Sequence, residues 1–268
     1  MARPTSFPDA PAASSQKGPC VYLFAFLLIG IAAHPLVAAD ANADPQPCRA
    51  TLALTANDVS QRLATKNNER SQHLLSFEGK RHYDLEYSGF PSTRGAEMNV
   101  DASYRAPGKK KLVVVSESGS KVILNHVLHR LLASEEESSS DDASRSAVAV
   151  TPENYRFSLR GCDAAGGRDL YVMDVQPLHD SRFLYRGTIW VDVQDFAVVR
   201  IEAEPAKNPS FWTKRSTIHH QYRKIGDFYL PSFNQTVTET RFGGRAVLTI
   251  RYDNYRLDSS GGKRIAEN

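Results

Sequence analysis

The chain has 268 residues, of which 41% are hydrophobic and 24% are charged, close to the usage of an average globular protein. Its formal net charge is +3, and the basic residues are scattered along the chain. A nucleic-acid-binding protein would concentrate such residues in a basic stripe, so we expect no nucleic acid partner.

The N-terminal residues have the order of a secretory signal peptide. Arg3 and Lys17 precede an apolar run at residues 20–33, and small residues follow it. The run is shorter than the ~20 residues of a membrane-spanning helix. We therefore expect residues 1–39 to be a signal peptide that directs export and is cleaved after Ala39 or Ala43. An uncleaved membrane anchor is the alternative.

Residues 40–54 form a polar linker that contains proline. Of the three cysteines, Cys20 lies in the predicted signal peptide, and Cys48 and Cys162 remain. In an oxidising compartment these two could form one disulfide or stay as separate thiols, and both alternatives stay open. Their spacing matches no zinc site.

Two helices are predicted. Residues 55–75 begin with side chains that can cap a helix and carry a thin apolar stripe, which needs a surface to lie on. Residues 122–132 are apolar almost all round, so this second helix must be largely covered. The acidic, Ser-rich segment 134–146 that follows has no apolar anchor and lacks the ligand spacing of a calcium loop. We expect a flexible, solvated loop there.

Elsewhere, apolar and polar residues alternate with a period of two, which is typical of half-buried strands. The first strands are predicted at about 82–87, 96–104 and 111–116. After Pro152 they follow at about 154–161, 169–177, 183–193, 197–204, 214–225, 228–240 and 245–257. This pattern predicts a mainly β protein with a long, meandering antiparallel sheet. Such a sheet curls, and it either closes or is covered by helices.

No motif indicates an enzyme. A nucleophile elbow, a P-loop, a zinc-binding H-E-x-x-H and a dinucleotide fingerprint are all missing from the sequence. His219 and His220 are adjacent on a strand and point to opposite faces, so they cannot hold one metal. Asp192 and Asp195 could suggest a catalytic pair, but the alternation places Asp192 on a strand and Asp195 in the following turn. We therefore expect a protein without catalytic residues, metal or cofactor.

The hairpin that contains these aspartates resembles a known family. Residues 187–192 (GTIWVD), followed by 198–202 (VVRIE), resemble the W-[VI]-D and V-V-R-I-E strands of the LolA/LolB-like outer-membrane lipoprotein-sorting proteins. Residues 226–231 (GDFYLP) and 249–257 (TIRYDNYRL) resemble two further strands of that family. The resemblance covers most of residues 55–258.

The resemblance implies one barrel domain over residues 55–258. We expect the residues that follow it, 259–268, to be a disordered tail. It implies an incomplete antiparallel β-barrel of about ten to eleven strands, with helices covering the open side. In this family the cavity between barrel and helices binds the acyl chains of lipoproteins. The implied function is therefore a periplasmic lipid or acyl-chain binding protein, such as a lipoprotein carrier. Related domains sense envelope stress, so the alternative is a regulatory domain that contacts an inner- or outer-membrane partner protein.

A cavity of this kind would be lined by the apolar faces of several strands. The candidate ligand-binding residues are Met98, Val100 and Tyr104; Ile189, Val191 and Val193; and Leu248, Ile250 and Tyr252. Each could equally be an ordinary core residue, because barrel interiors are commonly filled. Carriers of the family also latch their helices with an arginine on an early strand, and the candidates here are Arg81, Arg94 and Arg105.

Overall fold

The computed structural model describes residues 54–90, 92–139, 142–165, 167–181, 183–208, 211, 213–241, 243–262 and 264–266. The predicted signal peptide and nearly all of the predicted linker lie outside the described residues. The described residues are mostly β and form one open antiparallel sheet with few helices, which confirms the predicted fold class.

The helices are α1 (Ala56–His73), α2 (Lys121–Ile123), α3 (His129–Ser139) and α4 (Asp142–Val148), and a π-helical stretch, η1 (Leu124–Leu128), joins α2 to α3. The strands are β1 (Leu74–Ser88), β2 (Arg94–Arg105), β3 (Lys109–Gly119), β4 (Tyr155–Ala165), β5 (Arg168–Pro177), β6 (Tyr185–Asp192), β7 (Val198–Pro205), β8 (Thr213–Ile225), β9 (Phe228–Thr240), β10 (Arg245–Ser259) and β11 (Arg264–Ala266). Within the described part of the chain, no helix is both long and apolar enough to cross a membrane.

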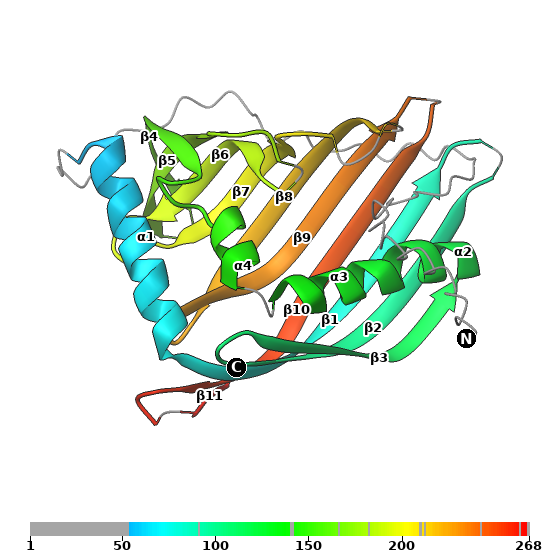
Figure 1. The fold of residues 1–268 in the computed structure, drawn as a ribbon, viewed down its shortest axis with the longest axis horizontal. Helices are drawn as coiled ribbons and strands as arrows, with labels where there is room; N and C mark the ends of the chain where they lie inside the picture. Colours follow the sequence, from blue (N-terminus) through cyan, green and yellow to red (C-terminus); the bar gives the residue numbers. More distant parts are fainter. Residues whose placement is uncertain are drawn as a thin grey trace, which may run out of the picture.

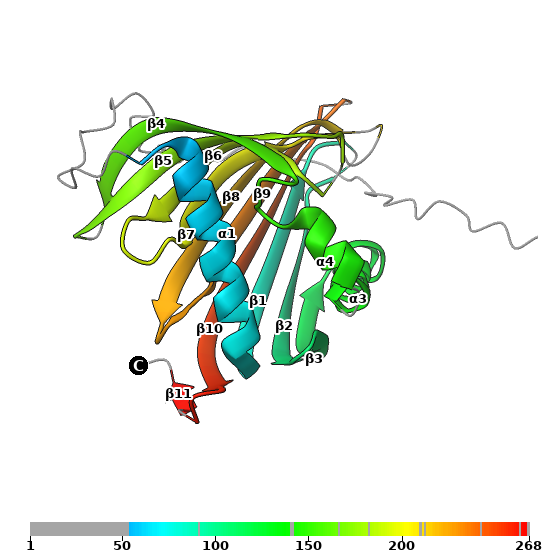
Figure 2. The same cartoon turned by 60° about the vertical axis from the view of Figure 1, so that its left-hand side comes forward.

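The strand order places the two ends of the helical connection at opposite edges of the sheet. The order is β3-β2-β1-β10-β9-β8-β7-β6-β5-β4, with the short β11 paired to β10. The chain leaves the edge strand β3, runs through α2, α3 and α4, and enters the other edge strand, β4. Figures 1 and 2 show α1 and α3 on the same side of the curved sheet. We call this side the inner face and the opposite side the outer face.

Two separate hydrophobic cores lie on the inner face. The first lies between α2–α3 and strands that include β1, β2 and β10, where Tyr83, Met98 and Leu128 are fully buried. The second lies between α1 and strands β4–β7, against which Val59 and Leu63 of α1 pack. A fully buried aliphatic side chain contributes about 1.5–3 kcal/mol. Each helical segment is therefore held mainly by its own core.

The acidic segment 134–146 is not the flexible loop that its composition predicts, because α3 and α4 cover most of it. Glu135 forms ion pairs with Arg81 (2.8 Å) and Lys110 (2.7 Å). Glu136 accepts a hydrogen bond from the backbone of β3 (2.5 Å). These partners come from β1 and β3, so the composition of the segment alone could not indicate that its acidic side chains are anchored.

The predicted disordered tail, 259–268, contains the short strand β11, which pairs with β10. Ile265 packs against the first core, and Arg264 forms an ion pair with Asp258 (3.1 Å). One apolar side chain and one charge pair thus order part of a segment whose small, polar composition predicts disorder.

Candidate functional site

A row of directly paired residues crosses the inner face from β2 to β5, and only its middle is polar. The row consists of Met98, Tyr83, Ile250, Asn234, His220, Ile201, Ile189 and Met173. All of these except Asn234 and His220 belong to the first or the second core. At this row, strands β8 and β9 therefore place a polar pair between the two cores on the inner face.

His220 is neutral at pH 7. Burial and the neighbouring His219 lower the pKa of His220 to about 4, and a hydrogen bond with Asn234 only partly opposes this shift. His219 lies on the outer face, where its Nδ1 is 3.6 Å from a carboxylate oxygen of Glu202. The two histidines thus face opposite sides, as the strand alternation predicts. No group of three side chains that could hold a metal occurs among the residues described.

A pocket of about 300 Å³ lies beside this row, between α1 and the middle strands, and we call it the inner pocket. Its sheet wall is mostly apolar or aromatic, whereas α1 contributes mainly polar side chains. The lining residues are Asn67, Arg70, Ser71, Leu74, Val150, Val198, Ile201, Tyr222, Phe228, Tyr229 and Leu230. The volume is at the lower end for small-molecule sites, and the lining suits an apolar chain.

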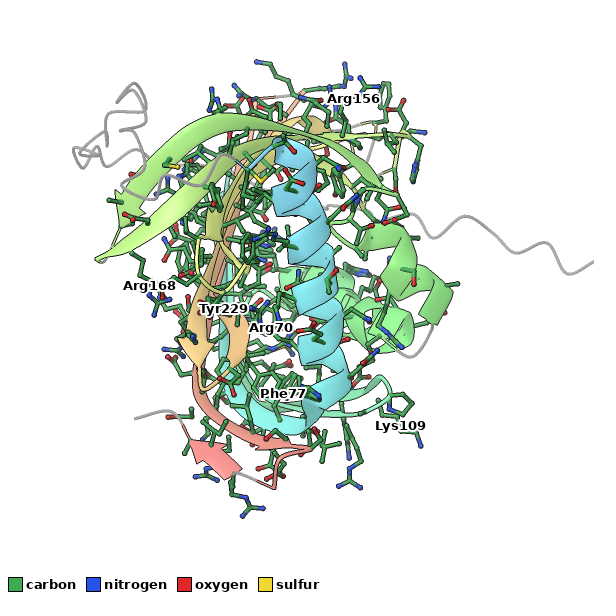
Figure 3. The ribbon with its side chains drawn as sticks, turned by 90° about the vertical axis from the view of Figure 1, so that its left-hand side faces the viewer. Arg70, Phe77, Lys109, Arg156, Arg168 and Tyr229 are labelled. Carbon is green, nitrogen blue, oxygen red and sulfur yellow. The ribbon has the colours of Figure 1, made fainter. Side chains whose placement is uncertain are left out.

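Hydrogen bonds join the polar side chains at the rim of the inner pocket. Tyr229 donates to Oδ2 of Asp195 (2.5 Å), which also accepts from Nζ of Lys224 (2.5 Å). The guanidinium of Arg70 lies 5.3 Å from the centroid of the Tyr229 ring, and Nη1 of Arg168 lies 3.4 Å from the Tyr229 hydroxyl. Figure 3 shows Tyr229 between Arg70 and Arg168. Burial and the bond to Asp195 raise the pKa of Tyr229, so its hydroxyl stays protonated at pH 7.

Asp192 and Asp195 have separate partners, which confirms the predicted turn. Oδ1 of Asp192 accepts hydrogen bonds from the backbone N–H groups of Gln194 (2.9 Å) and Asp195 (3.0 Å) and so shapes the turn between β6 and β7. Partial burial alone would raise the pKa of Asp195, but the hydrogen bonds from Lys224 and Tyr229 lower it. Asp195 is therefore a charged anchor at the rim of the inner pocket.

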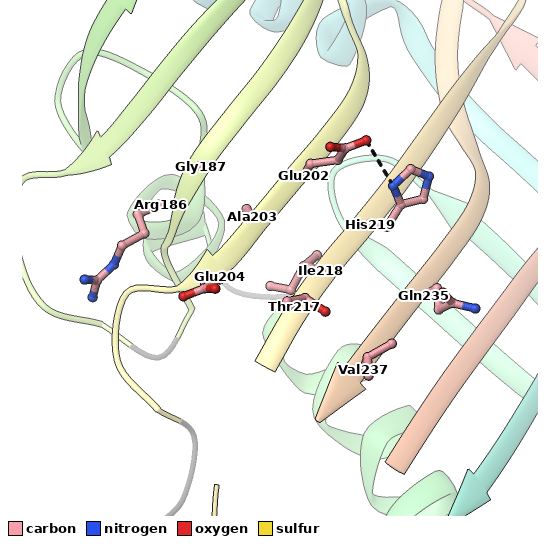
Figure 4. Close-up of a pocket in the computed structure, with 10 residues that line it drawn as sticks. All are labelled: Arg186, Gly187, Glu202, Ala203, Glu204, Thr217, Ile218, His219, Gln235 and Val237. Carbon is pink, nitrogen blue, oxygen red and sulfur yellow. Dashed lines mark ion pairs between the residues drawn. The ribbon is translucent and has the colours of Figure 1, made fainter. Parts of the chain in front are cut away.

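Strands β7 and β8 pair over four residues only, from Arg200 opposite Gln221 to Ala203 opposite Ile218, and a pocket opens at each end of this ladder. The first, of about 460 Å³, is called the basic pocket and is lined by Ala165, Arg168, Leu170, Val199, Arg200, Gln221, Tyr222, Arg223 and Lys224. The second, of about 450 Å³, is called the distal pocket and is lined by Arg186, Gly187, Glu202, Ala203, Glu204, Thr217, Ile218, His219, Gln235 and Val237. Figure 4 shows that the distal pocket contains both signs of charge, with Glu202 paired to His219.

The nine residues predicted to bind a ligand do not line these three pockets. The first core contains Met98, Val100, Leu248, Ile250 and Tyr252. The second core contains Ile189, Val191 and Val193. Tyr104 stacks on Phe77, with ring centroids 5.4 Å apart. The structure thus divides the set between packed regions, and a part for these residues in ligand binding stays a prediction.

Among the three arginines that the resemblance suggests as a latch, Arg81 contacts the helical segment. Its side chain is 7% exposed and donates to both carboxylate oxygens of Glu135 on α3, at 3.0 and 2.8 Å. It also donates to the hydroxyl of Tyr83 (3.1 Å). Arg105, by contrast, is exposed. Arg81 therefore ties α3 to β1.

Three residues of the inner pocket, Phe228, Tyr229 and Leu230, come from the GDFYLP segment that the sequence indicated only as a strand start. Successive residues of a strand face opposite sides, so three apolar or aromatic residues in a row indicate apolar surface on both faces. That run was the available signal for this part of the pocket.

No protein-family model and no curated protein matches this chain. Among solved structures, it is similar to an outer-membrane lipoprotein-sorting protein domain from Vibrio parahaemolyticus, at 10% identity over 75% of this chain and 93% of that chain, with a TM-score of 0.39. It is similar to a LolA superfamily protein from Nitrosomonas europaea, at 11% identity over 77% and 94%, with a TM-score of 0.31. A chain of the Pseudomonas aeruginosa MucA/MucB complex matches at 12% identity over 76% and 94%, with a TM-score of 0.24. The solved structures that the chain matches thus include proteins of the family that the sequence resembles, at low identity, and we draw no conclusion about ligand or partner from them.

Proposed function

We propose that this protein is an exported, periplasmic protein that binds an acyl chain in the inner pocket, as a carrier or receptor for lipids or lipoproteins rather than as an enzyme. The observation that carries the proposal is the inner pocket itself, an apolar hollow of about 300 Å³ beside two filled cores on the helix-covered face. Its apolar side chains are Leu74, Val150, Val198, Ile201, Phe228 and Leu230.

An acyl chain needs no catalytic group to bind at such a site. Burial of one methylene group contributes about 0.8 kcal/mol, so about six buried methylenes would contribute about 5 kcal/mol before the entropic cost of association. The polar lining residues Asn67, Arg70 and Ser71 come from α1, and the hydroxyl of Tyr229 is bonded to Asp195, so the wall formed by β7 and β9 stays mostly apolar. This division between wall and rim favours a ligand that enters with its apolar end first.

The test is to purify the exported protein and to look for bound lipid by native mass spectrometry and solvent extraction, followed by titration with a fluorescent fatty acid. Val198→Phe fills the inner pocket and is expected to weaken fatty acid binding by at least about tenfold. Val115→Phe adds the same side chain on β3, where Val115 is 60% exposed, and should leave binding unchanged. Thermal unfolding of both variants reports whether they fold. Wild-type protein that carries no lipid and binds no fatty acid would show the proposal to be wrong.

The alternative, a regulatory domain with a membrane partner, is examined on the same preparation. The N-terminal sequence of the exported protein shows whether residues 1–39 are retained. Retention would favour a membrane-anchored sensor, whereas cleavage would favour a freely diffusing carrier.

A further inference from the structure

Four cations line the basic pocket, and no carboxylate is among its lining residues. Lys224 is paired with Asp195 at 2.5 Å, whereas, among the described residues, the three arginines have carboxylates no nearer than 3.6 Å. Arg168 comes from β5, Arg200 from β7, and Arg223 and Lys224 from β8, and they surround a floor that includes the buried Leu170. Arginine and lysine side chains converging on one hollow are the usual arrangement for binding a phosphate or a carboxylate. The composition of this pocket therefore indicates an anionic group above an apolar floor.

Arg200 retains hydrogen-bonding capacity for such a group. Its guanidinium lies over Trp190, 3.5 Å from the ring centroid, and its side chain is 33% exposed. The carboxylates of Glu202 and Asp163 are 3.6 and 3.9 Å away, beyond the ~2.7–3.2 Å of an ordinary hydrogen bond. Stacking on Trp190 thus holds the guanidinium in place, and neither carboxylate forms an ordinary hydrogen bond with it.

The basic pocket and the inner pocket share a wall. Tyr222 lines both, and the successive residues Val198 and Val199 of β7 line the inner and the basic pocket, respectively. The ladder between β7 and β8 ends at Arg200 opposite Gln221. Val198 and Val199 lie beyond this end, where β7 is not paired with β8. Successive residues of a strand face opposite sides. The apolar pocket on the inner face therefore meets the basic pocket on the outer face at an unpaired part of the sheet.

We infer that the ligand is an acidic single-chain amphiphile, whose apolar chain lies in the inner pocket and whose phosphate or carboxylate group lies in the basic pocket. This inference rests on the proposed function, because it takes the inner pocket to hold an acyl chain. It adds the chemical class of the ligand and a site for its head group. A neutral lipid would fill the inner pocket and leave the four cations of the basic pocket without an anionic group of the ligand.

Calorimetric titrations with decyl phosphate, decanoate and decanol test the inference, because the three share one chain and differ in head group. We expect decyl phosphate or decanoate to bind at least about tenfold more tightly than decanol. This advantage, the ratio of the affinity for the anion to the affinity for decanol, should fall as the salt concentration rises. In Arg168→Gln/Arg200→Gln the advantage should fall below about threefold. The single variant Arg168→Gln is measured as well, because Arg168 is 48% exposed and its substitution should leave the fold intact if the double variant does not fold. The control is Arg160→Gln/Arg215→Gln, which removes two exposed arginines elsewhere on β4 and β8.

The outcomes separate the two proposals. Equal affinity for decanol and the two anions, or an anion preference that survives in Arg168→Gln/Arg200→Gln, would overturn the inference and leave acyl-chain binding intact. Failure of all three probes to bind would overturn the proposed function as well. Titration with inorganic phosphate distinguishes a free anion from a lipid head group. If inorganic phosphate binds as tightly as decyl phosphate, the pocket is a phosphate site and the amphiphile assignment is wrong.

Discussion

Arg70, in the last turn of α1, donates hydrogen bonds to the backbone carbonyls of Asp195 and Phe196, in the turn between β6 and β7. This turn joins the two strands, residues 187–192 and 198–202, that carry the family resemblance of the sequence. Hydrogen bonds to the side chain of Asp192 set the shape of the turn. The turn therefore does more than connect β6 to β7. It presents two carbonyl groups that fix the C-terminal end of α1, and with it one wall of the inner pocket.

Arg70→Ala is expected to lower the free energy of unfolding by about 1.5–3 kcal/mol, because two carbonyl groups lose a charged donor. Urea unfolding followed by circular dichroism measures this loss. Lys66→Ala is the matched control on the same helix, since Lys66 is 49% exposed and pairs with the exposed Glu69; its effect should stay within about 0.5 kcal/mol. Equal losses in the two variants would mean that Arg70 does not anchor α1.

The Arg81–Glu135 pair ties α3 to β1, and its disruption should lower the free energy of unfolding by more than Arg70→Ala does. Glu135→Gln leaves Arg81, which is 7% exposed, without a full counter-charge and should destabilise the fold by about 3 kcal/mol or more. Arg105→Ala, at an exposed arginine of β2, is the control. Hydrogen exchange should show the loss of protection concentrated in α3. Protection lost evenly over the whole sheet would contradict a local latch.

Local alternation predicts most of the strands, because a half-buried strand needs one apolar and one polar face. Met98, Val100 and Ala102 are buried with the predicted period, and β9 occupies the predicted range. The strand order is a different matter. Tyr83 on β1 pairs with Ile250 on β10, far away in the sequence, and no local pattern indicates which distant strands become neighbours. The helical course of the acidic segment depends on such distant partners too.

The pockets were harder to predict than the sheet for a physical reason. Regular alternation identifies side chains that pack well, so the apolar sets chosen from it, such as Ile189 and Val191, lie in a core. A pocket occurs where packing is incomplete. The inner pocket lies where the β7–β8 ladder stops, next to Tyr222 of β8, which pairs with no residue of β7. The end of a ladder is a tertiary feature that the periodicity of a single strand does not contain.

Cys162, on the edge strand β4, is disulfide-bonded, and the other two cysteines of the chain lie outside the described residues. We expect its partner to be Cys48, because Cys20 belongs to the predicted signal peptide. Cys48→Ser and Cys162→Ser should then each lower the free energy of unfolding by about 2–4 kcal/mol, because the loss of the bridge frees a long loop in the unfolded chain.

The double variant should lose no more than either single variant, which distinguishes a shared bridge from two separate thiols. Peptide mapping under non-reducing conditions identifies the linked pair directly. A single variant at Cys48 with wild-type stability would rule this pairing out.

The half-buried His220, between the two cores, should make stability depend on pH. The pKa of His220 is lowered from 6.5 to about 4, mainly by burial. Between these two values the unfolded chain binds a proton at this residue and the folded chain does not. The free energy of unfolding should therefore fall as the pH decreases from about 6.5 to about 4, with a slope from this group of at most about 1.4 kcal/mol per pH unit.

His220→Asn keeps a polar side chain opposite Asn234 but cannot titrate, so its stability should fall less steeply over the same range. Urea unfolding at several pH values between about 7.5 and 4.5 measures both slopes. His179→Asn, which removes an exposed histidine, is the control and should follow the wild type. An unchanged slope in His220→Asn would show that other groups cause the acid sensitivity. A flatter slope in His220→Asn would show that His220 causes part of the acid sensitivity of the wild type. The folded protein then keeps this imidazole neutral because burial disfavours its charged form.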